Sequence, residues 1–189
     1  MATRRICDQR SDKLLVEICN DGDAKEATQA FEVLYKRHKD YVVRVALRFV
    51  HDHDLALDAL QETFSYLLRQ FPPTGEGLRL TAKLSTYIYP IAKNYAITLR
   101  RKADRFPESP TGPDDLAAEP IAAVTDIGGL LTELSDQHRE VIALRFADDL
   151  SLQEIAEALQ IPVGTAKSRL HLAIKQLKNS PKTKEMLDR

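Results

Sequence analysis

The sequence predicts an all-α protein made of two small helical domains joined by an acidic, Pro-rich linker. Apolar residues recur every three to four positions over long stretches, and no stretch of useful length alternates as a β-strand does. Between two such stretches, the periodicity disappears and prolines accumulate. The 189 residues suffice for two modest domains, since domains commonly hold roughly 100 to 150 residues.

The first predicted domain, residues 11–103, begins with two helices. Ser11 begins the first one, which ends near residues 20–22. The second is a helix of about seven turns that a polar turn at residues 51–54 ends. Its apolar stripe consists of Ala27, Phe31, Leu34, His38, Val42, Val45 and Phe49.

Two further helices complete this domain. The stripe of the third is Leu57, Leu60, Phe64, Leu67, Leu68 and Phe71, and a breaker-rich loop at residues 72–77 ends it. Thr81 can cap the fourth helix, in which Pro90 is expected to cause a kink. The predicted buried face of the fourth helix is Leu84, Ile88, Ile91, Tyr95 and Leu99.

Residues 104–129 form the predicted linker, which lies in the acidic part of the chain between two basic stretches. The linker holds four prolines, and residues 106–129 carry five acids and no base. Residues 71–105 carry a net charge of +5 and residues 163–184 carry +6, although the whole chain has a net charge of only −1. Two basic stretches in two helical domains favour nucleic-acid binding, whereas either one alone is also typical of a solvated helix face.

The second predicted domain, residues 130–180, has the pattern of a helix-turn-helix. Ser135 can cap a helix that holds Val141, Ile142 and Phe146, and Ser151 with Glu154 forms a capping box before a short acidic helix. A turn at residues 160–162 leads to a basic helix from Val163 to about Lys178, the element that would enter the DNA major groove. The apolar side of this helix is Val163, Ala166, Leu170, Ala173, Ile174 and Leu177. The opposite side holds Thr165, Ser168, His171, Leu172 and Lys175, with Lys167 and Arg169 on the flanks. An ordinary helical hairpin with a solvated basic face has the same spacing, so the pattern alone leaves both interpretations open.

Three segments resemble bacterial RNA polymerase sigma factors of the extracytoplasmic-function (ECF) group, in the sigma-70 family. Residues 150–171 resemble the domain that reads the promoter −35 element, most specifically in IPVGTAKSRL at 161–170. The sequence DALQETF at 58–64 is similar to the helix that binds the polymerase clamp. YIYPIAKN at 87–94, followed by Arg100 and Arg101, is similar to the helix that reads the −10 element. The resemblance covers roughly residues 11–103 and 130–178.

The resemblance implies a transcription initiation factor whose partners are core RNA polymerase, promoter DNA and an anti-sigma factor. The implied polymerase contacts are Asp58, Gln61 and Glu62. The implied −10 contacts are Arg79, Lys83, Tyr87, Lys93, Asn94, Arg100 and Arg101, with Tyr89 as a further aromatic candidate for stacking on an unpaired base. The implied −35 contacts are Thr165, Lys167, Ser168, Arg169, His171 and Lys175.

Several positions depart from the family pattern. Tyr87 stands where the family usually has Trp, Pro90 interrupts a helix that is usually unbroken, and Thr98 replaces a usual Asp. Leu172 and Ile174 stand where arginines are common, which removes phosphate contacts that tail residues Lys178, Lys182 and Lys184 can replace. We therefore expect unusual strand-opening geometry and fewer phosphate contacts from the last helix.

Composition and motifs argue against other functions. With 43% hydrophobic and 29% charged residues, no apolar run long enough for a membrane span, and a charged N-terminal stretch, we expect a cytoplasmic protein without membrane insertion. Cys7 and Cys19 are interpreted as reduced thiols, and His38 is interpreted as a satisfied core histidine. His51 and His53 lack the further ligands that a metal site needs. We expect no metal, no cofactor and no enzyme activity. Two rival hypotheses remain: a sigma mimic that binds an anti-sigma factor without reading DNA, and a free-standing helix-turn-helix regulator.

Overall fold

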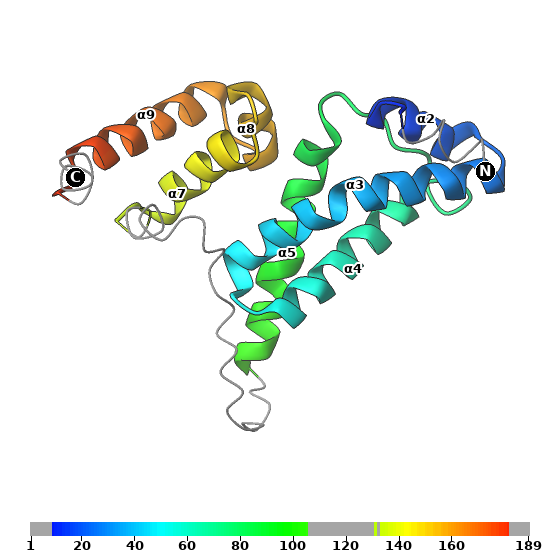
Figure 1. Cartoon of the computed structure of the whole chain (residues 1–189), viewed down its shortest axis with the longest axis horizontal. Helices are drawn as coiled ribbons and strands as arrows, with labels where there is room; N and C mark the ends of the chain where they lie inside the picture. Colours follow the sequence, from blue (N-terminus) through cyan, green and yellow to red (C-terminus); the bar gives the residue numbers. More distant parts are fainter. Residues whose placement is uncertain (1–8, 106–130, 132, 182–189) are drawn as a thin grey trace. The chain divides into compact units, whose positions relative to one another are not determined.

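The computed structural model describes residues 9–105, 131 and 133–181, and this part of the chain contains helices and no strand. The chain divides into two compact units, Met1–Asp115 and Leu116–Arg189, which Figure 1 shows as two helical groups. The all-α prediction is confirmed for the described residues. Almost all of the predicted linker lies outside them.

The first two helices of the N-terminal unit begin at side-chain caps. Helix α2 (Asp12–Asp21) follows Ser11, whose Oγ accepts a hydrogen bond from the backbone N–H of Leu14 at 3.4 Å. Helix α3 (Ala24–Val50) follows Asp23, which accepts hydrogen bonds from two backbone N–H groups of the first turn. Helix α3 ends at His51, whose φ of 55° places it in the left-handed region. Both predicted helices are confirmed.

Helix α4 (His53–Arg69) differs from the prediction in the face that it buries. Asp52 caps it by accepting a hydrogen bond from the backbone N–H of Leu55 at 2.9 Å. The predicted stripe included Leu57 and Leu68, but these side chains are 42% and 54% exposed. The helix buries a partly different set: Ala56, Ala59, Leu60, Thr63, Phe64 and Leu67. Two alanines and a threonine therefore face the core where leucines were expected.

Helix α5 (Leu84–Arg105) begins three residues after its predicted cap. The carbonyl of Lys83 accepts the first hydrogen bonds, so Thr81 is not the cap. The buried face is Leu84, Thr86, Ile88, Tyr89, Ala92 and Ala96, whereas the predicted core residues Ile91, Tyr95 and Leu99 are half-buried. The helix includes Pro90 and continues through Arg105, two residues into the predicted linker. The expected kink at Pro90 stays a prediction.

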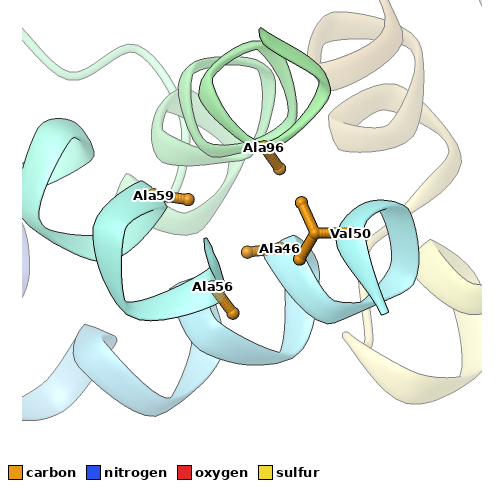
Figure 2. Close-up of a cluster of buried hydrophobic side chains, with 5 residues drawn as sticks. All are labelled: Ala46, Val50, Ala56, Ala59 and Ala96. Atoms are coloured by element: carbon orange, nitrogen blue, oxygen red, sulfur yellow. The ribbon is translucent and has the colours of Figure 1, made fainter. Parts of the chain in front are cut away.

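Small side chains fill the place where α3, α4 and α5 meet. Figure 2 shows Ala46 and Val50 from α3, Ala56 and Ala59 from α4, and Ala96 from α5 gathered in one buried cluster. Larger rings pack elsewhere in the same unit, with Phe31 in edge-to-face contact with Phe64 at 6.2 Å and with Phe71 at 6.1 Å between ring centroids. Because side chains at the contact set the distance between helix axes, the alanines let the three helices approach closely.

In its described residues, the C-terminal unit contains α7 (Asp136–Ile142), a π-helical turn η1 (Ala143–Ala147), α8 (Leu152–Leu159) and α9 (Val163–Asn179). The predicted capping box of α8 is confirmed: Ser151 N–H donates to Glu154 Oε2 at 2.8 Å, and Glu154 N–H donates to Ser151 Oγ at 3.3 Å. Ser135 occupies the N-cap position of α7, but its side chain makes no capping hydrogen bond.

The core of this unit differs from the prediction at two residues. Leu134, Ile142 and Ala173 form one buried cluster, and further buried apolar side chains include Leu144, Leu150 and Ile155. Phe146, which was expected on the apolar side of the first helix, is 66% exposed, because it lies in η1 and a π-helical turn shifts the phase of the side chains that follow it. Val163 is 46% exposed, since it is the first residue of α9 and lies beside the turn that precedes the helix.

Candidate nucleic-acid interface

The outward face of α9 is exposed and carries no acidic residue. Ala166 and Ala173 are fully buried and fix the opposite side of the helix against the unit. All six residues predicted to contact the −35 element have side chains that are exposed or only partly buried. Lys167, Ser168, His171 and Lys175 are exposed, whereas Thr165 and Arg169 are half-buried. Leu172 is 47% exposed among them, so an apolar side chain lies within a polar and basic surface.

The turn before α9 is fixed by the backbone. Gln160 adopts a φ of 54°, and the N–H of Ile161 donates to the carbonyl of Ala156 at 2.9 Å. The carbonyl of Pro162 then accepts from Thr165 and Ala166, which starts the next helix. These bonds give α8 and α9 the tight connection of a helix-turn-helix.

Two arginines of this unit are used internally. Arg139 donates to the carbonyls of Leu131 and Leu134, each at 3.0 Å. Arg145 donates to the carbonyl of Leu150 at 3.0 Å. These guanidinium groups bond carbonyls that follow or precede the helices, so they serve the fold. The basic side chains that face solvent in the described C-terminal unit are concentrated on α9.

A second basic surface lies on the loop before α5 and on α5 itself. Arg79 and Lys83 are exposed, and Leu78, the residue before them, is buried. Lys83, Tyr87, Asn94 and Arg101 follow at spacings of four, seven and seven, which places them on one side of a helix. Asn94 and Arg101 are exposed.

Three predicted −10 residues have partners or burial that the sequence did not indicate. Tyr87 is half-buried, and burial together with a hydrogen bond to Tyr66 raises its pKa. Lys93 lies with its Nζ 5.6 Å from the ring centroid of Phe49, and Arg100 donates to the Phe49 carbonyl at 3.2 Å. Lys93 and Arg100 therefore contact the end of α3.

Tyr89 is wrong as a candidate for stacking on DNA, because its side chain is fully buried. The residue lies on the side of α5 that faces α3 and α4, where Ile88 and Ala92 are also fully buried. A ring without any exposed surface has no face to offer to an unpaired base. Tyr89 belongs to the core.

The side of α4 opposite the alanines is polar at its centre. Asp58, Gln61 and Glu62 are all exposed. They lie beside the exposed Leu57, so the surface mixes acidic, amide and apolar groups. Sequence reasoning missed the exposure of Leu57 and Leu68, although the alternative buried face contains two alanines, which are the signal for close helix packing.

The remaining candidates have structural explanations or lie outside the described residues. His38 is confirmed as a satisfied histidine, because its Nε2 lies 2.7 Å from Asp12 Oδ2. His51 ends α3 and His53 begins α4, and the described part of the chain contains no group of three or more metal-binding side chains. Cys19 is a buried free thiol. Cys7, Lys182 and Lys184 lie outside the described residues.

Among the described residues, no helix is both long enough and apolar enough to span a membrane. The fold and the exposed basic faces define the class: an all-helical protein with a helix-turn-helix in its C-terminal unit. The Sigma-70 region 2 model matches residues 34–106, and the Sigma-70, region 4 model matches residues 130–179. Both matches lie on the segments whose residues resembled sigma factors.

Comparison with curated proteins gives the same family. The chain is 30% identical over 167 residues to the ECF RNA polymerase sigma factor SigL of Mycobacterium tuberculosis, covering 83% of this chain and 92% of that protein. It is 29% identical over 161 residues to SigW of Bacillus subtilis, covering 75% and 83%. The chain belongs to the sigma-70 family, in its ECF group, and is a sigma factor that directs transcription initiation.

The fold is also found in solved structures. CnrH in complex with the cytosolic domain of CnrY superposes with a TM-score of 0.62 at 21% identity, covering 89% of this chain and 96% of CnrH. The sigma factor RpoE of Bartonella quintana, in complex with the anti-sigma factor NepR, gives a TM-score of 0.55 at 21% identity, covering 78% and 94%. At this identity the likeness shows the fold.

Proposed function

We propose that this sigma factor uses three separate surfaces: α4 for core RNA polymerase, the 79–101 region for the −10 element, and the outward face of α9 for the −35 element. Residues 11–103 then form the polymerase and −10 domain, 104–129 the linker and 130–180 the −35 domain. The observation that carries the proposal is the exposed face of α9, which is basic and free of acids on a helix-turn-helix. The protein acts in the cytoplasm, without catalytic residues of its own.

The α9 surface suits a DNA groove in its distribution of side chains. Thr165 and Ser168 lie near the start of the helix, where short side chains let the backbone approach base edges. Lys167, Arg169 and Lys175 flank them and are suited to phosphate oxygens. Leu172 contributes an apolar surface, which is the natural contact for a thymine methyl group. This face can therefore combine phosphate binding with base reading.

The −10 surface combines cations with an exposed amide. Arg79 and Lys83 are exposed before α5, and Asn94 and Arg101 follow on the helix. Holding an unpaired base needs hydrogen-bonding groups and a stacking partner, and Tyr87 is only half-buried despite its bond to Tyr66. Lys93 and Arg100 support this surface indirectly, through their contacts with Phe49 at the end of α3.

The polymerase surface on α4 is tested with a double variant. Replacing Gln61 and Glu62 with Ala should weaken binding to core polymerase by about tenfold or more while leaving helical content unchanged, because both side chains are exposed. The matched control replaces Lys39 and Asp40, two exposed residues of α3, with Ala. Binding is measured by competition for core polymerase. Equal binding by the double variant and the parent would remove this face from the proposal.

The −35 surface is tested by charge removal in the holoenzyme. Lys167→Ala and Lys175→Ala should each weaken promoter binding and lower the slope of log affinity against log salt by about one phosphate contact. Leu172→Arg should relax base preference at one −35 position while raising salt-dependent affinity. If all three variants leave promoter binding unchanged, the outward face of α9 is not the −35 surface. Tight, specific footprinting by the isolated chain would instead favour a free-standing regulator.

An anti-sigma factor is the proposed regulatory partner. Two proteins of the same fold, CnrH and RpoE of Bartonella quintana, were solved with the cytosolic domain of CnrY and with the anti-sigma factor NepR. The exposed Leu172 and Leu57 offer apolar anchors on two surfaces that DNA and polymerase also need. Affinity purification from the native cell tests the partner, and recovery of core polymerase without any inhibitor under repressing conditions would contradict it.

A further inference from the structure

The segment between α4 and α5 is fastened to α2 by one asparagine side chain. Asn20 Nδ2 donates to the carbonyl of Leu78 at 2.8 Å, and the N–H of Leu78 donates to Asn20 Oδ1 at 2.9 Å. These two bonds, called the clasp below, join residues 58 positions apart in the sequence. A carboxamide that bonds both the N–H and the C=O of one residue fixes that residue in position and in orientation.

The backbone around Leu78 is shaped to accept this clasp. Gly77 has a φ of +96°, a conformation that side chains disfavour, and a Cβ placed there would lie 3.0 Å from Asn20 Oδ1. The N–H of Gly77 donates to the carbonyl of Gln70 at 3.0 Å, which ties the loop back to the end of α4. The Leu78 side chain is 7% exposed. The loop is therefore held on both sides of Gly77.

Helix α2 is itself fixed against α3 at its opposite end. Asp12, in its first turn, accepts from Arg37 Nη1 at 2.7 Å and lies 2.7 Å from His38 Nε2. Leu15 and Cys19 are buried between these contacts and Asn20. The helix thus connects α3 with the loop that follows α4, and Asn20 is the end that meets the loop.

Only five residues separate the clasp from α5. Leu78 and Leu84 are both buried, and the exposed Arg79 and Lys83 lie between them. A segment this short, anchored at both ends, has few accessible conformations. The position of Leu78 therefore limits where the side chains of Arg79 and Lys83 can lie.

We propose that Asn20 is a positioning residue for promoter reading: through its clasp on Leu78, it sets the placement of the 79–83 segment that contacts the −10 element. This inference rests on the proposed function, which assigns that segment to −10 DNA. Asn20 itself touches no DNA. Asn20 affects the base preference at the −10 element, because a 79–83 segment that can shift makes equally good contacts with several bases.

The experiment uses the full chain with core polymerase and a promoter selected by the parent holoenzyme from a randomised DNA library. For each variant, binding is compared between this promoter and copies with single substitutions in the −10 element. Asn20→Ala should reduce the −10 base preference by about tenfold, the factor that corresponds to ~1.4 kcal/mol. Core binding and −35 preference should change less than twofold. Glu17→Ala, at an exposed position one turn earlier on α2, is the matched control.

A second pair of variants separates positioning from loss of fold. Gly77→Ala brings a methyl group against Asn20 Oδ1 and should reproduce the loss of −10 preference. In a chain that already carries Asn20→Ala, adding Gly77→Ala should cost less preference than it does alone, since the clasp is already gone. Additive losses, or an equal fall in core binding, −35 preference and −10 preference, would overturn the inference and leave Asn20 with a purely structural role.

Failure of this inference differs from failure of the proposed function. If Arg79→Ala and Lys83→Ala lower the −10 preference but Asn20→Ala does not, the segment reads DNA without help from Asn20. If none of the three changes the −10 preference, the segment is not part of the −10 surface.

Discussion

The two units of this sigma factor differ in the reach of the side-chain hydrogen bonds that hold them. In the N-terminal unit, Asn20 bonds to Leu78 across 58 residues and Arg100 bonds to Phe49 across 51. In the C-terminal unit, Arg145 bonds to Leu150 across five residues, and the capping box spans three. Gln176, which donates to the carbonyl of Glu133 at 2.7 Å, is an exception there.

This difference follows from what each unit presents. The proposed −35 surface of the C-terminal unit lies on a single helix, which caps, a tight turn and the bond from Gln176 place. The N-terminal unit presents a loop together with a helix, and a loop has no internal hydrogen-bond ladder that fixes its shape. Contacts from distant segments must supply that constraint. In this chain, the proposed −35 surface thus depends mainly on local contacts, and the proposed −10 surface depends more on long-range ones.

The largest expected effect comes from the core of the N-terminal unit. Leu34 is fully buried on α3, so Leu34→Ala should lower the free energy of unfolding by about 2–5 kcal/mol through lost burial and a residual cavity. Hydrogen exchange should show the loss of protection in α3, α4 and α5, with α8 and α9 unaffected. Equal loss of protection in both units would contradict a separate core in each.

A smaller effect is expected from the local signal of the C-terminal unit. Ser151→Ala removes the side chain that accepts from Glu154 N–H and should lower the free energy of unfolding by about 1 kcal/mol. Ser135→Ala is the control, because Ser135 makes no side-chain capping bond and its replacement should have less effect. Thermal unfolding followed by circular dichroism measures the stability of both variants. Equal decreases in their unfolding temperatures would show that the capping box does not stabilise the unit.

The tie between α2 and α3 should be sensitive to acid. The hydrogen bond with His38, and then the one with Arg37, hold the pKa of Asp12 below its usual value of 3.8, against the effect of burial. A lowered pKa adds stability above the unfolded value, and that stability is lost as the pH falls through the folded value. Asp12→Asn should therefore be less stable than the parent at pH 6, and the gap should shrink below about pH 4. A gap that persists unchanged at lower pH would assign it to packing.

The smallest expected effect is a change in the rate at which Cys19 is alkylated. Burial raises the pKa of its thiol to about 12, so the thiolate that alkylating agents attack is scarce at pH 8. In a Cys7→Ser chain, iodoacetamide should label Cys19 only when the N-terminal unit opens. Labelling should accelerate in Leu34→Ala and stay at the parent rate in Ser151→Ala. Acceleration by Ser151→Ala would show that the two units open together.

Sequence reasoning predicted the helices because their signals are local. Ser11, Ser151 and Glu154 act within three residues of the backbone groups that they bond. It failed where a neighbour in space decides the outcome. Leu57 was expected in the core, but the alanines of α4 face α3 and α5 instead, and hydrophobicity alone does not distinguish a leucine stripe from a close-packed alanine stripe.

The candidate sites show the same division. The outward face of α9 followed from helical periodicity, since Ala166 and Ala173 are buried and Ser168 and His171 are exposed. Tyr89, a candidate for stacking on DNA, lies in the core, because the sequence did not show which side of α5 meets α3. The clasp of Asn20 on Leu78 had no sequence signal, since it depends on a fold that brings residues 58 positions apart together.

The alanine cluster where α3, α4 and α5 meet makes the N-terminal unit sensitive to substitutions that enlarge a side chain. Ala46, Ala56, Ala59 and Ala96 have no exposed surface. At such a position almost every replacement adds atoms and only glycine removes them, whereas at a leucine position most replacements remove atoms. A saturation library should therefore be depleted of bulky variants at these four codons even when the hydrophobic character is kept. Within this unit, tolerance to substitution would then be lowest at the smallest side chains.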